Sequence, residues 1–166
     1  MLQRSKYIFV LFSLGLLLFS CDKNRVFDQY ISTADGWDKK KAVVFNHEQQ
    51  DTVSLYNMYV NVRTTDAYPY SNLFLIVETG FPDKTVKRDT LEYQMTNPDG
   101  SMMGKGFSDV KESALWFKDN YTFPQAGKYT FKVFQAVREV GHTEGISKLD
   151  GITEVGFRIE NTNTNE

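Results

Sequence analysis

The segment YNMYVNVR, residues 56–63, decides the fold class of this chain. Its apolar side chains fall on every second residue, a period that predicts a β-strand with one buried face. The inward set is Tyr56, Met58, Val60 and Val62, and the outward set is Asn57, Tyr59, Asn61 and Arg63. Working outward along the chain, the same period recurs at 91–95, 129–133 and 155–159, so we expect further half-buried strands there.

Other segments differ from this alternating pattern. Leu73–Val77 (LFLIV) is apolar at every position, which predicts a central strand buried on both faces. Ala42–Phe45 is a shorter candidate strand, and Ser108–Leu115 is a candidate for one helical turn before a strand at Trp116. We expect Trp116 in the core, because both of its neighbours are large and apolar.

Turn signals separate the expected strands. They stand at Phe81–Lys84, Pro124–Gly127 and Asn97–Gly100, where Pro98 and the final glycine suit a type I turn. The approach to Tyr129 resembles a tyrosine corner, in which the hydroxyl bonds nearby backbone. No apolar helical pattern exceeds about two turns. We therefore predict an all-β chain, a two-sheet β-sandwich of about eight strands with a jelly-roll-like or immunoglobulin-like topology.

The first residues have the form of an export signal. Arg4 and Lys6 precede Tyr7–Phe19, an uncharged apolar run that is too short to span a membrane and suits a signal peptide. Leu18–Cys21 (LFSC) resembles a bacterial lipobox, after which signal peptidase II cuts before the cysteine. We expect Cys21 to carry a diacylglyceryl thioether and an N-acyl chain such as palmitate, and two or three acyl chains anchor a protein stably.

This plan divides the chain into four parts. Residues 1–20 form the cleaved lipoprotein signal peptide, and residues 21–25 form a short lipidated tether. Residues 26–160 form the β-sandwich domain, and residues 161–166 form a frayed polar tail. A tether of about five residues spans roughly 15–20 Å, so the domain is expected to work close to its own leaflet.

Composition argues against several classes of function. A net charge of -2 gives no footprint for nucleic acid. One cysteine and two histidines, His47 and His142, leave little for a metal site, and we expect both histidines in solvated loops. The chain has no nucleophile elbow, phosphate-binding loop or zinc-protease motif. We therefore expect no enzymatic activity, no metal and no cofactor beyond the lipid on Cys21, and we consider a small-molecule substrate unsupported.

A few residues are candidates for binding or modification. Tyr68 and Tyr70 flank a proline and form either a contact surface or a cover for a sheet edge. Thr52 and Thr90 lie in Asp-Thr-apolar tripeptides that resemble a bacterial O-glycosylation motif, both at expected strand starts. The basic run Lys39–Lys41 is either a solvated loop or a contact with acidic headgroups.

Across nearly its full length the sequence resembles the GldH family of gliding-motility lipoproteins from Bacteroidetes. The resemblance rests on the order of segments without catalytic motifs: the lipobox cysteine, 26–30 (VFDQY), Trp37, 56–63, 70–74 (YSNLF), 98–104 (PDGSMMG), 127–129 (GKY) and 149–157. It implies a non-enzymatic lipoprotein that supports gliding motility and the associated type IX secretion machinery. The implied partners are other envelope proteins of these systems, and no functional residue beyond Cys21 can be carried over.

The residues after the cysteine bear on the expected location. Asp22–Arg25 carries a charge of +1 and lacks the acidic cluster that accompanies surface export in this phylum, so we expect the periplasmic leaflet of the outer membrane. An envelope-anchored carbohydrate-binding module is the alternative, and a row of exposed aromatic side chains on one sheet face would favour it.

Overall fold

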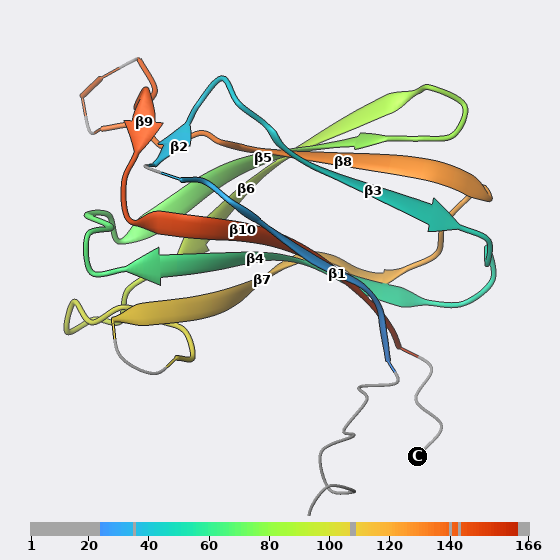
Figure 1. Ribbon diagram of the computed structural model, residues 1–166, viewed down its shortest axis with the longest axis horizontal. Helices are drawn as coiled ribbons and strands as arrows, with labels where there is room; N and C mark the ends of the chain where they lie inside the picture. Colours follow the sequence, from blue (N-terminus) through green and yellow to red (C-terminus); the bar gives the residue numbers. More distant parts are fainter. Residues whose placement is uncertain (1–23, 35, 107–108, 140, 143, 163–166) are drawn as a thin grey trace, which may run out of the picture.

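Ten β-strands make up the regular structure of the described residues, which in this computed structural model are 24–34, 36–106, 109–139, 141–142 and 144–162 (Figure 1). Eight of the strands are long and two, β2 and β9, have two residues each. The strands are β1 (Arg25–Ser32), β2 (Trp37–Asp38), β3 (Val43–Gln49), β4 (Tyr56–Thr65), β5 (Asn72–Gly80), β6 (Val86–Gln94), β7 (Val110–Tyr121), β8 (Gly127–Gln135), β9 (Lys148–Leu149) and β10 (Ile152–Asn161).

The eight long strands form two four-stranded antiparallel sheets with the orders β1-β10-β4-β7 and β3-β8-β5-β6. Taken in chain order, the first long strand pairs with the eighth, the second with the seventh, the third with the sixth and the fourth with the fifth. This nested pairing is that of one long hairpin folded over on itself, which is a jelly roll. The predicted sandwich is confirmed, and the strand order selects the jelly roll over the immunoglobulin-like alternative.

Because every pairing is antiparallel, the strand ends gather at two opposite ends of the sandwich (Figure 1). We call one of them the terminal end: it holds the start of β1, the end of β10 and the loops β3–β4, β5–β6 and β7–β8. The opposite, distal end holds the other connections and the small β2-β9 sheet. At about 3.3 Å per residue, the ten residues of β10 separate the two ends by roughly 30 Å.

The core lies between the inner faces of the two sheets. Phe157 on β10 stacks on Phe131 of β8 with ring centroids 4.3 Å apart, which joins one sheet to the other. The expected strand at Leu73–Val77 is β5, and it is central in its sheet. Its inner side chains are fully buried, whereas Phe74 and Ile76 are only half-buried on the outer face.

Hydrogen bonds in the turns confirm three local predictions. The backbone N–H of Lys84 donates to the carbonyl of Phe81 at 2.9 Å, and that of Gly100 donates to Asn97 at the same distance. The Tyr129 hydroxyl donates to the carbonyl oxygen of Gln125 at 2.8 Å, which is the bond expected of a tyrosine corner.

The structure also corrects one element and places others. The helical turn expected at Ser108–Leu115 is wrong, because β7 already begins at Val110. The first strand begins at Arg25, inside the segment expected to be the tether. Cys21 and the signal segment 1–20 lie outside the described residues. Among the residues that are described, no helix has the length and apolar character needed to cross a membrane.

Candidate functional site

The outer face of the β1-β10-β4-β7 sheet gathers the most unusual side chains of the described domain, and we call it the Trp116 face. Strand registers arrange it as three rows that run across the sheet. Read from β1 to β7, the rows are Asp28, Arg158, Tyr59 and Trp116; Tyr30, Gly156, Asn61 and Ala114; and Ser32, Glu154, Arg63 and Glu112.

The middle row is organised by the Tyr30 ring, which lies over Gly156. A Cβ atom at position 156 would stand 2.8 Å from two carbons of the Tyr30 ring, so only glycine leaves room for it. The Tyr30 hydroxyl donates to Oε1 of Glu112 at 2.9 Å and accepts a bond from Nδ2 of Asn61 at 2.8 Å. The Arg63 guanidinium lies 4.3 Å from the centroid of the same ring. Four strands are thereby joined through one side chain.

The third row is a line of paired charges. Arg63 lies between two carboxylates, with Nε 2.9 Å from Glu112 and Nη1 2.5 Å from Glu154. The hydrogen bonds that Arg63 donates to Glu112 and Glu154 raise the pKa of Arg63. Desolvation acts to raise the pKa of Glu112, but the bonds from Arg63 and Tyr30 outweigh it, so that this pKa is lowered. Arg63 and Glu112 are therefore both charged at neutral pH.

Tyr30 itself stays protonated. Desolvation, followed by the nearby Glu112 carboxylate, raises the pKa of Tyr30 to about 12. A tyrosine in this state donates its proton to Glu112 and is a poor base at neutral pH. The network therefore holds its side chains in place, because Tyr30, Arg63 and Glu112 form their hydrogen bonds with one another.

The first row exposes a tryptophan at the edge of the sheet. Trp116 is 53% exposed, and its ring packs on Tyr59 with centroids 4.5 Å apart. The guanidinium of Arg158 lies 5.0 Å from the Tyr59 ring on the other side of β4. The expectation of a core Trp116 is wrong, because neighbours in a strand point to opposite faces and its neighbours Leu115 and Phe117 point inward.

This face also holds all the buried side-chain polar atoms of the described residues that lack a hydrogen-bond partner. They are Oδ1 of Asp28, Oδ1 of Asn61 and Nε of Arg158, although the last lies 3.2 Å from a Glu160 oxygen. Each unpaired buried group costs about 1–3 kcal/mol. Proteins retain such costs chiefly at functional sites, which distinguishes this face from the rest of the domain.

A groove of about 670 Å³ borders the Trp116 face along β7. Glu112, Arg158 and Gln94 line it together with the loop segment 103–106. Gly104 holds that loop against the strand, since a Cβ there would come within 2.7 Å of the Glu112 carbonyl oxygen. The exposed tryptophan and the groove together give this flank both an apolar anchor and polar groups.

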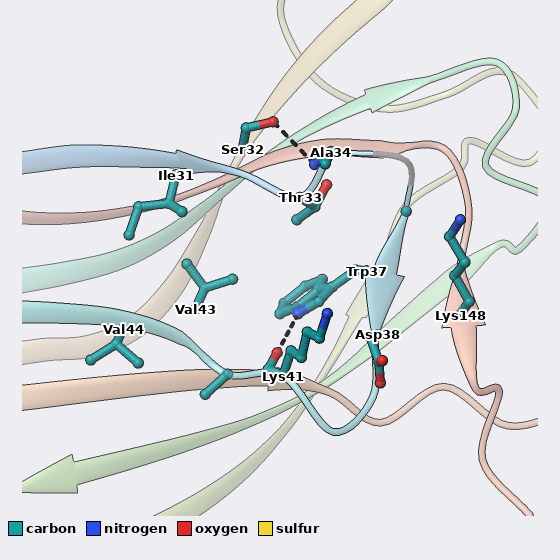
Figure 2. Close-up of a pocket in the computed structure, with 12 residues that line it drawn as sticks. Ile31, Ser32, Thr33, Ala34, Trp37, Asp38, Lys41, Val43, Val44 and Lys148 are labelled. Carbon is teal, nitrogen blue, oxygen red and sulfur yellow. Dashed lines mark hydrogen bonds between the residues drawn. The ribbon is translucent and has the colours of Figure 1, made fainter.

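A second depression, of about 630 Å³, opens between the edges of β1 and β3 (Figure 2). Ile31, Val43 and Trp37 form its apolar wall, and the Trp37 indole N–H donates to the carbonyl of Lys41 at 3.2 Å. Trp37 is buried, so its ring is not offered to a ligand. The two hydroxyls that line the depression are bonded to backbone: Ser32 donates to the carbonyl of Thr153, and Thr33 donates to the carbonyl of Ile152.

The residues predicted from sequence as site candidates lie apart from the Trp116 face. Tyr68 is buried and its hydroxyl donates to the carbonyl of Asn72 at 2.6 Å, so it belongs to the core and not to an exposed contact surface. Tyr70 is half-buried, with its ring 5.7 Å from that of Tyr68. Thr52 is exposed in the β3–β4 loop, and Thr90 is exposed in the middle of β6 instead of at a strand start.

The histidines do not form a metal site with other described residues. His47 is buried in β3, where Nε2 lies 2.8 Å from Oε1 of Gln49 and the ring packs against Phe27, so the expected solvated loop is wrong for it. His142 is exposed near Glu139. Within the described ranges, no three His, Cys, Asp or Glu side chains come together in a way that could hold a metal ion.

Sequence reasoning missed the Trp116 face, although one signal for it was present. The signal lies in the first strand identified, whose outward positions are Tyr59, Asn61 and Arg63. An aromatic ring, an amide and a cation stand together there, although a strand face that only contacts water needs no such combination. Their partners come from strands far away in sequence: Tyr30 and Glu112 are 82 residues apart.

Comparisons with known proteins point in one direction. The family model described as GldH lipoprotein matches residues 25–159. The gliding motility lipoprotein GldH of Flavobacterium johnsoniae is 50% identical over 158 residues, which cover 95% of this chain and 98% of that protein. The gliding motility lipoprotein GldH homolog of Christiangramia forsetii is 47% identical over 159 residues, with the same two coverages. Among solved structures, the infectious bursal disease virus VP2 subviral particle aligns at a TM-score of 0.36 and 10% identity, over 85% of this chain and 34% of that one, which is too low to support an argument.

Proposed function

This chain belongs to the GldH lipoprotein family, and from that membership we propose that it is a non-enzymatic outer-membrane lipoprotein supporting gliding motility and the associated type IX secretion machinery through protein–protein contacts. The observation that carries the proposal is the similarity to the gliding motility lipoprotein GldH, which extends over 95% of this chain and 98% of the relative. The family model matches residues 25–159, a range that includes all of the four strands of the Trp116 face except the last two residues of β10.

The arrangement of the Trp116 face supports a role in binding proteins. Tryptophan, tyrosine and arginine dominate the energetics of protein interfaces, and all three are held here in fixed positions. The positive charge of Arg63 is already paired with the carboxylates of Glu112 and Glu154, so an incoming partner need not neutralise it. Trp116 projects from this rigid support and is the natural anchor for a partner surface.

The same network supports the absence of enzymatic activity. Tyr30, Arg63 and Glu112 satisfy one another, and none of the three is left as a free base or nucleophile. In the groove along β7, Glu112 accepts bonds from Tyr30 and Arg63, and the Ser113 hydroxyl donates to the carbonyl of Met103. No metal or cofactor enters the proposal apart from the lipid on Cys21.

The location follows from the lipoprotein family and the first residues of the chain. Family membership makes this a membrane-anchored envelope protein. We propose Cys21 as the lipidated residue and the periplasmic leaflet of the outer membrane as its site. Antibody labelling of intact, unpermeabilised cells that express the protein should therefore fail, and strong labelling would place the domain on the cell surface.

The function is tested by deleting the gene in its native host. We expect many secreted proteins to disappear together from the medium and from the cell surface, with loss of colony spreading. Complementation with the wild-type chain should restore both, whereas the Cys21→Ser chain should not. An unchanged secreted proteome with normal spreading would contradict the proposal.

A matched pair of variants assigns the contact to one face. Trp116→Ala removes the exposed ring, and Val44→Ala removes an exposed side chain from the outer face of the other sheet. Both proteins should accumulate to wild-type levels, but only Val44→Ala should restore spreading. Equal complementation by the two variants would show that the partner binds elsewhere.

The carbohydrate-binding alternative retains one supporting observation. Trp116 is exposed on a sheet face, but Tyr59 is buried beneath it and Trp37 is in the core, so the described aromatics do not form an exposed row. A glycan-array assay on the lipidated chain in detergent decides the matter: binding that Trp116→Ala abolishes would favour a carbohydrate module over a protein-binding one.

A further inference from the structure

The most exposed large apolar side chains of the described domain gather at its terminal end. Val53 is 84% exposed, Val86 65% and Val26 46%, and all three lie at that end. Leu55, which is also exposed, is in the same loop as Val53. Of the other large apolar side chains, only Trp116 exceeds Val26 in exposure, and it lies in the middle of its strand.

The loop that presents Val53 is held firmly in place. Oδ1 of Asp51 accepts hydrogen bonds from the backbone N–H of Val53 at 2.8 Å and of Ser54 at 3.1 Å. Its other oxygen accepts a bond from the Tyr56 hydroxyl at 3.1 Å. A bond from the Ser54 side chain, followed by the backbone bonds from Val53 and Ser54, lowers the pKa of Asp51 and keeps it ionised. A hydrogen-bonded turn therefore holds the valine in its exposed position.

Backbone hydrogen bonds bring this loop to the place where the chain leaves the domain toward Cys21. The N–H of Thr162 donates to the Leu55 carbonyl at 2.9 Å, and the N–H of Asn161 donates to that of Asn24 at 2.8 Å. Val26 follows two residues later, at the start of β1. Only four residue steps separate Cys21 from Arg25, a distance of at most ~14 Å. A lipid on Cys21 thus holds this end of the sandwich near the bilayer.

We propose that Val26, Val53 and Leu55, which we call the apolar tip, rest on the lipid leaflet that holds the acyl chains of Cys21. The occupant of this surface is a bilayer interface, and the inference rests on the proposed lipidation. Burial of apolar side chains in the interface adds to an acyl anchor. The domain is then docked on the membrane in one orientation instead of swinging on its tether.

The contact depends on apolar side chains more than on charge. The basic run Lys39–Lys41 lies between β2 and β3, at the distal end and roughly 30 Å from the tip. Lys39 is occupied there by the carbonyl of Gly145 at 3.0 Å. Docking should therefore occur on neutral phosphatidylcholine and should survive high salt, which would release a contact made by lysines with acidic headgroups.

Single-cysteine labelling tests the proposal on the full lipidated chain in phosphatidylcholine vesicles. Because Cys21 is the one cysteine of the sequence and its thiol is consumed by the lipid, a second cysteine can be labelled alone. Val53→Cys places an environment-sensitive fluorophore on the apolar tip. Val110→Cys is the matched control, an exposed valine at the start of β7 at the distal end.

We expect the label at position 53 to shift to the blue, to be quenched by nitroxide-bearing lipids and to lose its quenching by aqueous iodide. The label at position 110 should remain fully open to iodide. Equal access of iodide to the two positions would overturn the docked orientation, as would quenching of both labels by lipid. Two observations made together would also overturn the docked orientation: a hexose on Thr52, and a label at position 53 that iodide can reach. The sugar would then occupy the loop that is proposed to rest on the membrane.

The labelling chemistry separates this inference from the proposed lipidation. If Cys21 carried no lipid, the wild-type chain itself would take up the label and the protein would not float with the vesicles. A lipidated chain that floats but shows an open position 53 would contradict the docking alone. Val53→Ser should weaken iodide protection at a label placed at position 26, whereas Val110→Ser should leave it unchanged.

Discussion

Gly156 determines where the Tyr30 ring can lie, and a single methyl group at this position tests the network of the Trp116 face. In Gly156→Ala, the new Cβ would displace the ring from its bonds with Glu112 and Asn61. We expect a loss of about 1–3 kcal/mol in the free energy of unfolding, as is usual for overpacking. Urea unfolding measures it.

The control for that substitution is Gly80→Ala at the end of β5. The nearest atom to a Cβ at position 80 is the Thr130 carbonyl oxygen at 3.5 Å, which is ordinary contact. We expect little change in the free energy of unfolding for this variant. An equal loss in both variants would mean that any strand methyl is costly, and the close approach of Tyr30 would not be the cause.

The ionisation of Tyr30 gives the stability of the domain a dependence on alkaline pH. Desolvation first, and then Glu112, raises its pKa from the ordinary 10.0 of a tyrosine to about 12. The folded state therefore binds the phenolic proton more tightly than the unfolded state does, so this stabilisation is complete below pH 10 and is lost as the pH rises toward 12. Burial raises the pKa of Tyr93 to about 12 as well, so Tyr30→Phe should reduce the slope of that part of the stability–pH curve without removing it. Thermal unfolding at successive pH values measures the slope. A curve of unchanged slope would contradict the assignment.

At the scale of one element, the alternation of β7 makes adjacent residues differ sharply. Phe117 is buried against Phe157 with ring centroids 5.9 Å apart, whereas Trp116 faces outward on Tyr59. Phe117→Ala should lower the free energy of unfolding by about 3–5 kcal/mol. Trp116→Ala should lower it by about 1 kcal/mol, the value of an aromatic pair. Chemical denaturation of the two variants in parallel checks the difference, and equal losses would contradict the orientation of the strand.

Local sequence patterns predicted the strands in which large apolar residues alternate with polar ones. β4, β8 and β10 carry large apolar side chains at every second position of their inner faces, so a two-residue period reveals them. The outer face of β4 is buried as well at Tyr59 and Asn61, which the period did not indicate. The period is weaker in the edge strands: β1 places an exposed Gln29 on its inner face, and β7 places Trp116 on its outer face. Trp116 was expected in the core because both of its sequence neighbours are apolar. That argument failed because it ignores the direction in which each side chain of a strand points.

The pairing of strands was beyond local patterns for a different reason. Each row of the Trp116 face is set by registers between β1, β10, β4 and β7, and those registers join residues far apart in the chain. Sequence resemblance supplied the family without supplying these contacts. Nothing in the vicinity of Tyr30 in sequence indicates that Asn61 and Glu112 will share its hydroxyl.

At the scale of the whole molecule, the nested pairing places β10 between β1 and β4. A chain that ends at Gly151 would lose β10, leaving β1 without a pairing partner and β4 with an open edge. We expect such a chain to remain unfolded, because the inner face would also lose Phe157. Far-UV circular dichroism checks this prediction, and a cooperative β-sheet transition in the truncated chain would contradict it.

The course of β1 from the terminal end to the distal end has a mechanical consequence. If a partner bound nearer the distal end held the domain while a force pulled on the lipid at Cys21, the tension would act along the axis of β1. Six consecutive residue pairs, from Phe27 to Ser32, join β1 to β10 in one register, and a lengthwise load acts on them simultaneously in shear instead of peeling them one at a time. A protein of the gliding apparatus attached in this way would bear force through its strongest direction.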